Sequence, residues 1–226
     1  MLLGLISDIH ANIYGLEAAL EALRLRGVDA ILCAGDLVGY YPYVNETLDM
    51  LREYEVECVL GNHDAIVVGR LPAEPAERLK YRVDATEDAL APHHRDWIAQ
   101  LPLRRRYSWG QATLELCHGS PWFPLTEYIY PDYDQFERFA AHSAAYVILG
   151  HTHWPLLRRE GNVTIFNPGS CGQPRDWRPG ACYGVLSVDD NRCELHHTEY
   201  DLSTLLADLK RQRFEPALIE ILTRTK

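Results

Sequence analysis

The chain has 226 residues, of which 47% are hydrophobic and 24% are charged, enough apolar material for one sizeable core. Its formal net charge of -10 argues against general binding to nucleic acid or to anionic membranes. No apolar run reaches membrane-spanning length, and the apolar start is too short for a signal peptide. We therefore expect a cytoplasmic protein, a single domain over 1–226, with no membrane and no stable nucleic acid partner. An oligomer stays open.

The first third of the chain alternates between strand and helix patterns. Apolar runs at 2–7, 30–34 and 56–60 predict three strands. Leucines and alanines at helical spacing predict a helix over 16–25 that Gly27 ends, and a second helix follows over 44–54. Strands joined by helices in this way pair in parallel through right-handed crossovers.

The middle of the chain is helical in pattern but is interrupted by four prolines, which predicts a helical insertion at about 66–103, packed beside or over the sheet. The next two runs, 104–109 and 112–117, predict a hairpin that turns at Gly110. The remaining patterns predict a helix over 132–142, strands over 145–149, 163–166, 182–188 and 192–200, and helices from about 202 onward. Together these elements predict an α/β (α+β) fold with a mixed sheet or two stacked sheets and with helices on the outside.

The six cysteines include no C-x-x-C pair, which favours reduced thiols in the core. A zinc site formed by Cys171, Cys182, Cys193 and His196 would lack the usual paired-ligand spacing. The histidine pairs at 93–94 and 196–197 are interpreted as exposed polar positions.

Metal-capable side chains follow five of the predicted strands. They are Asp8 and His10, then Asp36, then Asn62, His63 and Asp64, then His118, and finally His151 and His153. Ligands of open α/β sheets bind outside the carboxyl ends of the strands, so separate loops can bring these groups together.

Aspartate, asparagine and histidine offer the oxygen and nitrogen atoms that borderline divalent metals prefer. Seven of these residues are too many for one tetrahedral ion and suit two ions that share a bridging carboxylate. Such a pair can clamp a phosphoryl oxygen and turn water into a nucleophile near neutral pH. Each fragment alone is common in polar turns, and it is their conjunction that favours a metal site.

The ordered motifs Asp-x-His at 8–10, Gly-Asp at 35–36, Gly-Asn-His-Asp at 61–64, His-Gly at 118–119 and Gly-His-Thr-His at 150–153 resemble the calcineurin-like metallophosphoesterases. The stretches at 35–40, 167–170 and 172–175 are similar to the small bacterial and archaeal phosphodiesterase-like branch of that family. The resemblance implies a four-layer αββα sandwich, in which two stacked mixed sheets are flanked by helices.

The resemblance also implies roles. Asp8, His10 and His153 would hold the first metal, Asn62, His118 and His151 the second, and Asp36 would bridge both, with a water or hydroxide between the ions as the nucleophile. His63 has no place in either set of metal ligands and is expected to contact the substrate, and Asp64 is expected to orient the imidazole of His63. We expect two divalent ions, manganese first, with iron, zinc, nickel or cobalt able to serve. The sequence His118-Gly119-Ser120 departs from a His-Gly-His pattern, which leaves substrate preference more open.

Three further residues are candidate substrate contacts. Arg175 could hold a phosphate oxygen bidentately or pair with a carboxylate such as Asp176. Asn12 could touch a substrate oxygen or cap the helix that begins near Tyr14. Tyr40 belongs to a set of aromatic residues after the ligand loops that could stack on a base or pack on the core.

These observations together predict dinuclear-metal-dependent hydrolysis of a small phosphoester, with a diester or nucleotide-like substrate favoured. Two alternatives are kept: a phosphoprotein phosphatase of the serine/threonine type, and a non-catalytic metal-binding scaffold. Relatives of the second kind tend to lose ligands, whereas all of them are present in this chain.

Overall fold

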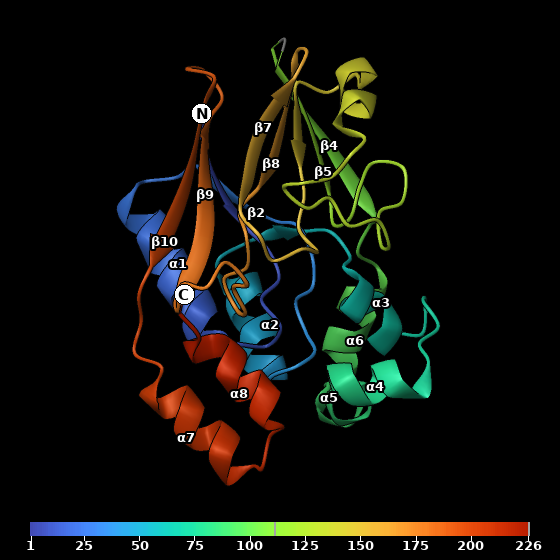
Figure 1. The fold of residues 1–226 in the computed structure, drawn as a ribbon, viewed down its shortest axis with the longest axis vertical. Helices are drawn as coiled ribbons and strands as arrows, with labels where there is room; N and C mark the ends of the chain where they lie inside the picture. The colour runs from blue at the N-terminus through green and yellow to red at the C-terminus, as the bar shows by residue number, and fades with distance from the viewer. Residues whose placement is uncertain (111, 226) are drawn as a thin grey trace.

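The computed structural model describes residues 1–110 and 112–225, and the strands in this part of the chain form two five-stranded sheets (Figure 1). The first sheet has the order β10-β9-β1-β2-β3. Its strands β1, β2 and β3 are parallel, as predicted, whereas β9 and β10 add in antiparallel fashion. The bounds are Leu2–Ile6 for β1, Ala30–Cys33 for β2, Glu57–Cys58 for β3, Ala181–Ser187 for β9 and Arg192–Thr198 for β10.

The second sheet has the order β4-β5-β6-β8-β7. The predicted hairpin forms its edge, and its tip continues from Gly110 into residue 111, which lies outside the described residues. The bounds are Arg104–Trp109 for β4, Ala112–Cys117 for β5, Tyr146–Ile148 for β6, Leu156–Glu160 for β7 and Val163–Asn167 for β8.

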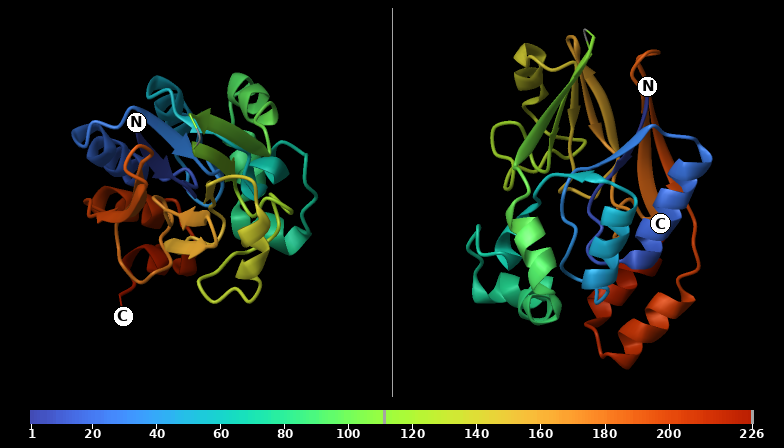
Figure 2. Two further views of the ribbon diagram at one scale, coloured as in Figure 1. Left: turned by 90° about the horizontal axis from the view of Figure 1, so that it is seen from above. Right: turned by 180° about the vertical axis from the view of Figure 1, so that it is seen from behind.

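The two sheets pack face to face. Figure 2 shows the blue and orange-red strands of the first sheet beside the green-to-amber strands of the second. Their inner faces share one apolar cluster, to which the first sheet contributes Leu5 and Leu186, and the second contributes Leu116 and Phe166. Because alternate residues of a strand point to opposite faces, the other apolar residues of each strand are left for the outer layers.

Helices complete the layers. Helices α1 (Ile13–Leu25) and α2 (Val44–Glu53) bury their apolar faces against the outer side of the first sheet. A short helix, η1 (Phe136–Ala141), and its flanking loop cover the outer side of the second sheet. The αββα sandwich with two mixed sheets is therefore confirmed.

The remaining helices gather at one end of the sheets. These are α3 (Asn62–Val67), α4 (Pro75–Tyr81), α5 (Val83–Ala89) and α6 (Pro92–Ala99), followed near the end of the chain by α7 (Ser203–Arg211) and α8 (Pro216–Thr223). In Figure 1 both groups lie below the sheets, at the end where the parallel strands finish. No helix among the described residues is both long enough and apolar enough to cross a membrane.

Two predicted elements differ from the structure, and one strand of the structure has no predicted counterpart. The helix expected over 132–142 is only the 3₁₀ helix η1, in which Phe136 and Phe139 are three residues apart and therefore reach the core together. The strand β7 was not predicted, because its sequence Leu-Leu-Arg-Arg-Glu belongs to a mostly exposed, charged edge strand. The predicted strand over 56–60 shortens to the two residues of β3.

The cysteines are unpaired thiols, and all but Cys193 are buried, as predicted. The interpretation of the histidine pair at 93–94 as exposed was wrong for His94, which is buried where α6 packs near α2. Its Nε2 atom lies 3.1 Å from Oδ1 of the exposed Asp49.

Candidate metal centre

The predicted ligands converge at the carboxyl ends of β1, β2, β5 and β6. Two groups of ligand atoms, each within 4.8 Å of one another, share one residue, Asp36. The first group consists of Asp8, His10, Asp36 and His153, and the second consists of Asp36, His118 and His151. All of these side chains are buried. Loops far apart in sequence thus build one site, as expected for this edge of the sheet.

In the first group two imidazoles face each other. The Nε2 atoms of His10 and His153 are 3.1 Å apart, and Nε2 of His153 is 3.5 Å from Oδ1 of Asp8. Nδ1 of His10 lies 3.2 Å from the carbonyl oxygen of Val38, and Nδ1 of His153 lies 2.7 Å from that of Gln173. A carbonyl oxygen can only accept, so each Nδ1 carries the proton and each Nε2 has a free lone pair.

The second group has the same design. Nδ1 of His118 donates to the carbonyl oxygen of Ala34 at 2.7 Å, so its Nε2 atom is the one that faces the rest of the group. That atom lies 2.9 Å from Oδ1 of Asn62 and 3.0 Å from Nδ1 of His151. The predicted fourth member of this group, Asn62, is therefore in place beside His118.

Asp36 lies between the two groups. Its Oδ2 atom is 3.6 Å from Nε2 of His10 and 3.4 Å from Nε2 of His118. Burial would raise the pKa of Asp36, but the imidazoles of His118 and His63 hold it well below its usual range. The carboxylate is thus ionised and central, as a bridging ligand has to be.

The electrostatics favour ligation by the histidines. Burial holds the pKa values of His10, His151 and His153 well below their usual range, with smaller contributions from neighbouring positive groups. These rings are therefore neutral at pH 7, the form that binds a metal. Burial also opposes the charged form of His118, but Asp36 outweighs it and raises the pKa of His118 to about 9.

The residues present fit divalent metal ions. Lone pairs of His10 and His153 point at each other across 3.1 Å, an arrangement that repels unless a cation lies between them. Oδ2 of Asp8 and Nε2 of His151 are buried and have no hydrogen-bond partner. A buried polar atom without a hydrogen-bond partner lowers the stability of the fold. Its presence within a set of nitrogen and oxygen donors therefore indicates that these atoms bind a metal ion.

The backbone at the ligands is unusual. Five of the seven predicted ligands have left-handed φ angles: Asp8 (53°), His10 (54°), Asp36 (57°), His151 (69°) and His153 (59°). Residues other than glycine seldom adopt this region, and such positions persist only where the surrounding structure holds them. At His151 and His153 this turn conformation directs the two side chains toward different groups of the site.

Asn167, the last residue of β8, and the segment after it hold these turns. The Nδ2 atom of Asn167 donates to the carbonyl oxygen of Gly150 at 2.7 Å, just before His151. The hydroxyl of Ser170 donates to the carbonyl oxygen of Asp8 at 2.6 Å. Gln173 supplies the carbonyl that orients His153. Contacts of this kind behind the predicted ligands fix the orientation of their side chains before a metal binds.

His63 lies beside the metal groups without being part of either. Its Nε2 atom is 4.0 Å from Oδ2 of Asp36, and its buried Nδ1 has no partner. Burial lowers the pKa of His63 to about 4, against the opposing charge of Asp36. The ring needs a glycine opposite it, because a Cβ atom on Gly39 (φ +91°) would stand 2.6 Å from Nδ1.

Asp64 does not orient the imidazole of His63, although the sequence led us to expect it. Its carboxylate accepts three backbone N–H groups, those of Leu37 at 2.9 Å, Val38 at 3.1 Å and Gly61 at 2.9 Å. These hydrogen bonds connect the loop after β2 to the loop after β3. The structure thus makes Asp64 a connector of two ligand loops, and its expected role in orienting His63 is corrected.

Of the three substrate-contact candidates, Asn12 is corrected. It is buried and caps α1, where its Oδ1 accepts from the backbone N–H of Gly15 at 3.1 Å. Its Nδ2 donates to the carbonyl oxygen of Gly172 at 2.7 Å and to the hydroxyl of Tyr200 at 2.8 Å. The helix-capping alternative therefore accounts for Asn12, which has no polar atom left for a substrate.

Tyr40 and Arg175 do lie at the site. Both line the small pocket over Asp36 and His63, and the ring of Tyr40 contacts that of His63 with centroids 4.8 Å apart. Arg175 is free of a carboxylate partner among the ion pairs of the described residues, so the salt bridge to Asp176 considered above does not form.

Two pocket residues, Lys80 and Tyr81, were not singled out from the sequence. They come from α4 in the insertion, and Tyr81 packs its ring 4.1 Å from that of His63. Neither belongs to a motif; the only sequence signal was the position of the insertion directly after the Asn62 loop. Tyr128, one of the aromatic residues after the ligand loops, stacks on His151 with ring centroids 3.7 Å apart.

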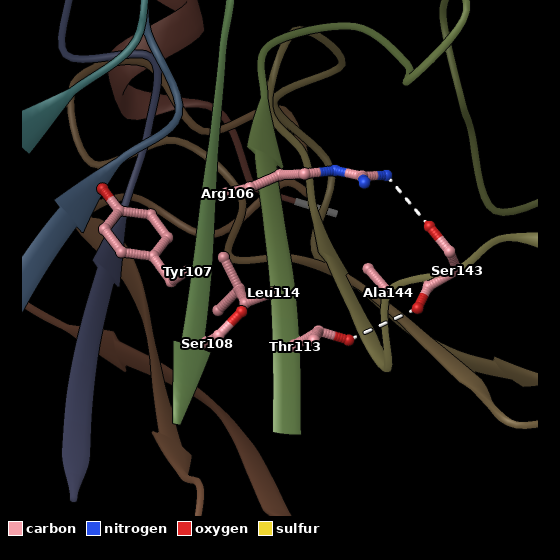
Figure 3. Close-up of a pocket in the computed structure, with 7 residues that line it drawn as sticks. All are labelled: Arg106, Tyr107, Ser108, Thr113, Leu114, Ser143 and Ala144. Carbon is pink, nitrogen blue, oxygen red and sulfur yellow. Dashed lines mark hydrogen bonds between the residues drawn. The ribbon is translucent and has the colours of Figure 1, made fainter. Parts of the chain in front are cut away.

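A different hollow lies away from these ligands. It is a cavity of about 230 Å³ on the hairpin of β4 and β5, beside the loop before β6 (Figure 3). Arg106 donates there to the hydroxyl of Ser143 at 3.0 Å, and the hydroxyl of Thr113 donates to the carbonyl oxygen of the same residue. The lining includes no metal ligand, so this cavity is separate from the centre.

Comparison with known proteins agrees with the geometry. Residues 1–191 match the sequence profile described as the calcineurin-like phosphoesterase superfamily domain. Protein MJ0912 of Methanocaldococcus jannaschii is 30% identical over 233 residues, which cover 94% of this chain and 93% of that protein. Phosphodiesterase YfcE of Escherichia coli K12 is 26% identical over 191 residues, which cover 81% and 85% of the two chains.

Solved structures show the same architecture. The crystal structure of a metallophosphoesterase from Sphaerobacter thermophilus is 33% identical, has a TM-score of 0.80 and covers 99% of both chains. Protein PH1004 from Pyrococcus horikoshii has a TM-score of 0.86 at 20% identity, covers 100% of this chain and 98% of that chain, and supports the fold alone. The chain therefore belongs to the calcineurin-like phosphoesterase superfamily and is a metal-dependent phosphoesterase.

Proposed function

We propose that this chain hydrolyses small phosphodiesters or nucleotide-like phosphoesters with two divalent metal ions. The observation that carries the proposal is the position of Asp36, whose Oδ2 atom lies within 3.6 Å of ligand nitrogens of both groups. One carboxylate between two donor sets suits a pair of ions better than a single one.

The residues divide between the ions as follows. Asp8, His10 and His153 would hold one ion, Asn62, His118 and His151 would hold the other, and Asp36 would serve both. When bound, the two ions supply Lewis-acid stabilisation of the phosphoryl oxygens and lower the pKa of water. We propose manganese as the physiological metal, because the donor set mixes carboxylate, amide and imidazole and contains no thiolate.

The other side chains at the pocket act on the substrate. With a pKa of about 4, His63 is neutral near pH 7 and has one ring N–H to donate. We propose that this N–H binds a phosphoryl or leaving-group oxygen, a hydrogen bond that strengthens as negative charge develops there. Arg175 adds a full positive charge on the same pocket, and Tyr40 packs against the imidazole and holds its position.

The shape of the pocket supports a small substrate. The space directly over Asp36 and His63 is about 40 Å³, and the side chains of Tyr81 and Tyr128 line it together with the ligands. A narrow, aromatic-walled entrance suits a small ester better than a phosphorylated side chain on a folded protein. The curated relative YfcE, named a phosphodiesterase, supports the same preference.

The test is metal-dependent turnover. Protein stripped with a chelator and reloaded with Mn²⁺ should hydrolyse bis(p-nitrophenyl) phosphate, with less activity toward the monoester p-nitrophenyl phosphate. The stripped protein and a reloaded Asp36→Asn variant serve as controls and should be inactive. Stoichiometric metal binding without turnover of either ester would instead favour the non-catalytic scaffold, and turnover of phosphopeptides alone would favour a phosphoprotein phosphatase.

A further inference from the structure

A second, larger cleft opens directly beside the metal pocket. It has a volume of about 550 Å³ and lies between helix α4 of the insertion and helix α8 near the end of the chain. Tyr40, Lys80 and Arg175 line both the cleft and the pocket over Asp36, so the two spaces adjoin. In Figure 1 the two helices stand on either side of the space below the sheets.

The cleft is cationic in an acidic protein. Its described lining includes one carboxylate, that of Glu215, and four cationic side chains, those of Lys80, Arg82, Arg175 and Arg224. The chain as a whole carries a formal net charge of -10. Among the described residues, no ion pair within 4.0 Å includes any of these four cations, although many other arginines of the chain are paired. Unneutralised positive charge gathered in a concave site attracts anions.

Two of the cations are held in place and partly withdrawn from water. Arg224 stacks over the ring of Trp177 at 4.5 Å, and its buried Nε atom has no hydrogen-bond partner. Burial and the nearby charge of Arg175 lower its pKa. Arg82 lies 3.8 Å over the ring of Phe214, and burial lowers its pKa against the opposing charge of Glu215. An anion beside Arg224 would offset the repulsion between Arg224 and Arg175.

The same cleft has an apolar wall. Leu79 of α4 is exposed, and Leu218 and Ile221 of α8 line the opposite side. Exposed leucines at the rim of a cleft are accounted for if a ligand covers them.

We infer that this cleft binds the part of the substrate beyond the scissile phosphate, and that this part carries a second anionic group joined through an apolar or planar body. The inference rests on the proposed function, since it places the scissile phosphate over Asp36 and His63. It narrows the substrate class from small phosphoesters in general to doubly anionic ones, such as a nucleotide with a further phosphate.

The experiment compares two esters that differ in one phosphate. Thymidine 5′-(p-nitrophenyl phosphate) has a single phosphodiester, and its 3′-phosphorylated derivative adds the second anion. In both, water adds to the diester phosphorus and the P–O bond to p-nitrophenolate breaks, so the coloured product reports the same step. We expect kcat/KM to be about tenfold higher for the 3′-phosphorylated ester, the size of one charge-assisted contact.

Substitutions test where this preference arises. In Arg224→Gln and in Arg82→Gln the ratio of the two kcat/KM values should fall several-fold toward one. Glu215→Gln should raise it, because it removes the one carboxylate found among the described residues of the lining. Arg159→Gln on the exposed strand β7 removes the same charge elsewhere and should leave the ratio unchanged. Since each ratio is taken within one protein sample, a loss of folded protein cancels.

Binding provides a readout that does not depend on turnover. Calorimetry should show thymidine 3′,5′-bisphosphate binding about tenfold more tightly than thymidine 5′-monophosphate, with the difference reduced in Arg224→Gln. If the metal-loaded protein cleaves neither ester, the proposed function fails while the calorimetric preference still tests the cleft. Equal kcat/KM values and equal affinities for the paired compounds would overturn the inference even in an active enzyme.

Discussion

His10 and His153 come from loops more than 140 residues apart, yet their Nε2 atoms lie 3.1 Å from each other. Both rings donate their Nδ1 protons to backbone carbonyl groups, so both facing nitrogens have free lone pairs. The fold therefore holds two nitrogen lone pairs against their mutual repulsion, with Oδ1 of Asp8 at 3.5 Å from one of them. A cation bound here would be attracted to both nitrogen lone pairs and to the carboxylate of Asp8.

Metal removal should consequently lower stability. Ions that bind only the folded chain stabilise it by about 2.7 kcal/mol at a concentration of 100 times Kd. Thermal unfolding of chelator-treated protein, followed during titration with Mn²⁺, should show Tm rising with the metal concentration. Equal Tm values with and without metal would show that these facing lone pairs do not constitute a metal site.

The two histidines of the turn after β6 should serve different ions. His153 belongs to the group of Asp8 and His10, and His151 to the group of His118, because the left-handed turn separates their side chains. His151→Ala and His153→Ala should each retain about one ion per chain by elemental analysis, and the double variant none. His197→Ala, on strand β10, serves as the control with full occupancy. One ion remaining in the double variant would mean that both side chains serve the same ion.

His63 should matter to catalysis and not to metal content. Its Nε2 atom is 4.0 Å from Asp36, and it takes no part in either ligand group. His63→Ala should lower kcat about 10²- to 10⁴-fold, the range usual for a positioned proton donor or acceptor. Elemental analysis of the same sample should still find the wild-type metal content. Loss of metal in this variant would place His63 among the ligands.

Stability should depend on pH through Glu127, in the loop that carries Tyr128. Burial raises the pKa of its carboxyl group, but Ser120, Tyr133 and Arg138 donate to the carboxylate and lower it overall. A lowered folded-state pKa contributes stability above the usual value of 4.5, and this contribution is lost as the pH falls through the folded-state pKa.

Glu127→Gln should therefore cost about 1–3 kcal/mol of unfolding free energy at pH 7, and less as the pH falls below 4.5. Denaturant unfolding at several pH values measures this difference. Glu137→Gln, on the exposed side of η1, should change stability little at any pH. A cost for Glu127→Gln that stays constant across the pH range would show that the charge of the carboxylate is not responsible.

Sequence alone could predict which residues converge at this site, because each one follows its strand within a short motif and the sheet brings the carboxyl ends of the strands together. It could not assign Asp64 correctly, because its partners are backbone groups of distant loops, such as the N–H of Leu37. For Asn12 the sequence did offer the helix cap, a local contact with Gly15 that the structure confirms. Lys80 was missed for a related reason: its place beside the metal pocket depends on how the insertion packs, which no local pattern encodes.

Asp64 should behave as a structural residue, in contrast to its neighbour His63. Its carboxylate accepts the N–H groups of Leu37, Val38 and Gly61, and thereby ties the loop of Asp36 to the loop of Asn62. In Asp64→Asn the new amide nitrogen can accept from none of these donors, so at least one buried N–H loses its partner, at a cost of about 1–3 kcal/mol. We expect Tm and metal affinity to fall together in Asp64→Asn, while kcat of the fully loaded protein falls much less than in His63→Ala. Unchanged stability with a loss of kcat equal to that of His63→Ala would return Asp64 to a direct role in the reaction.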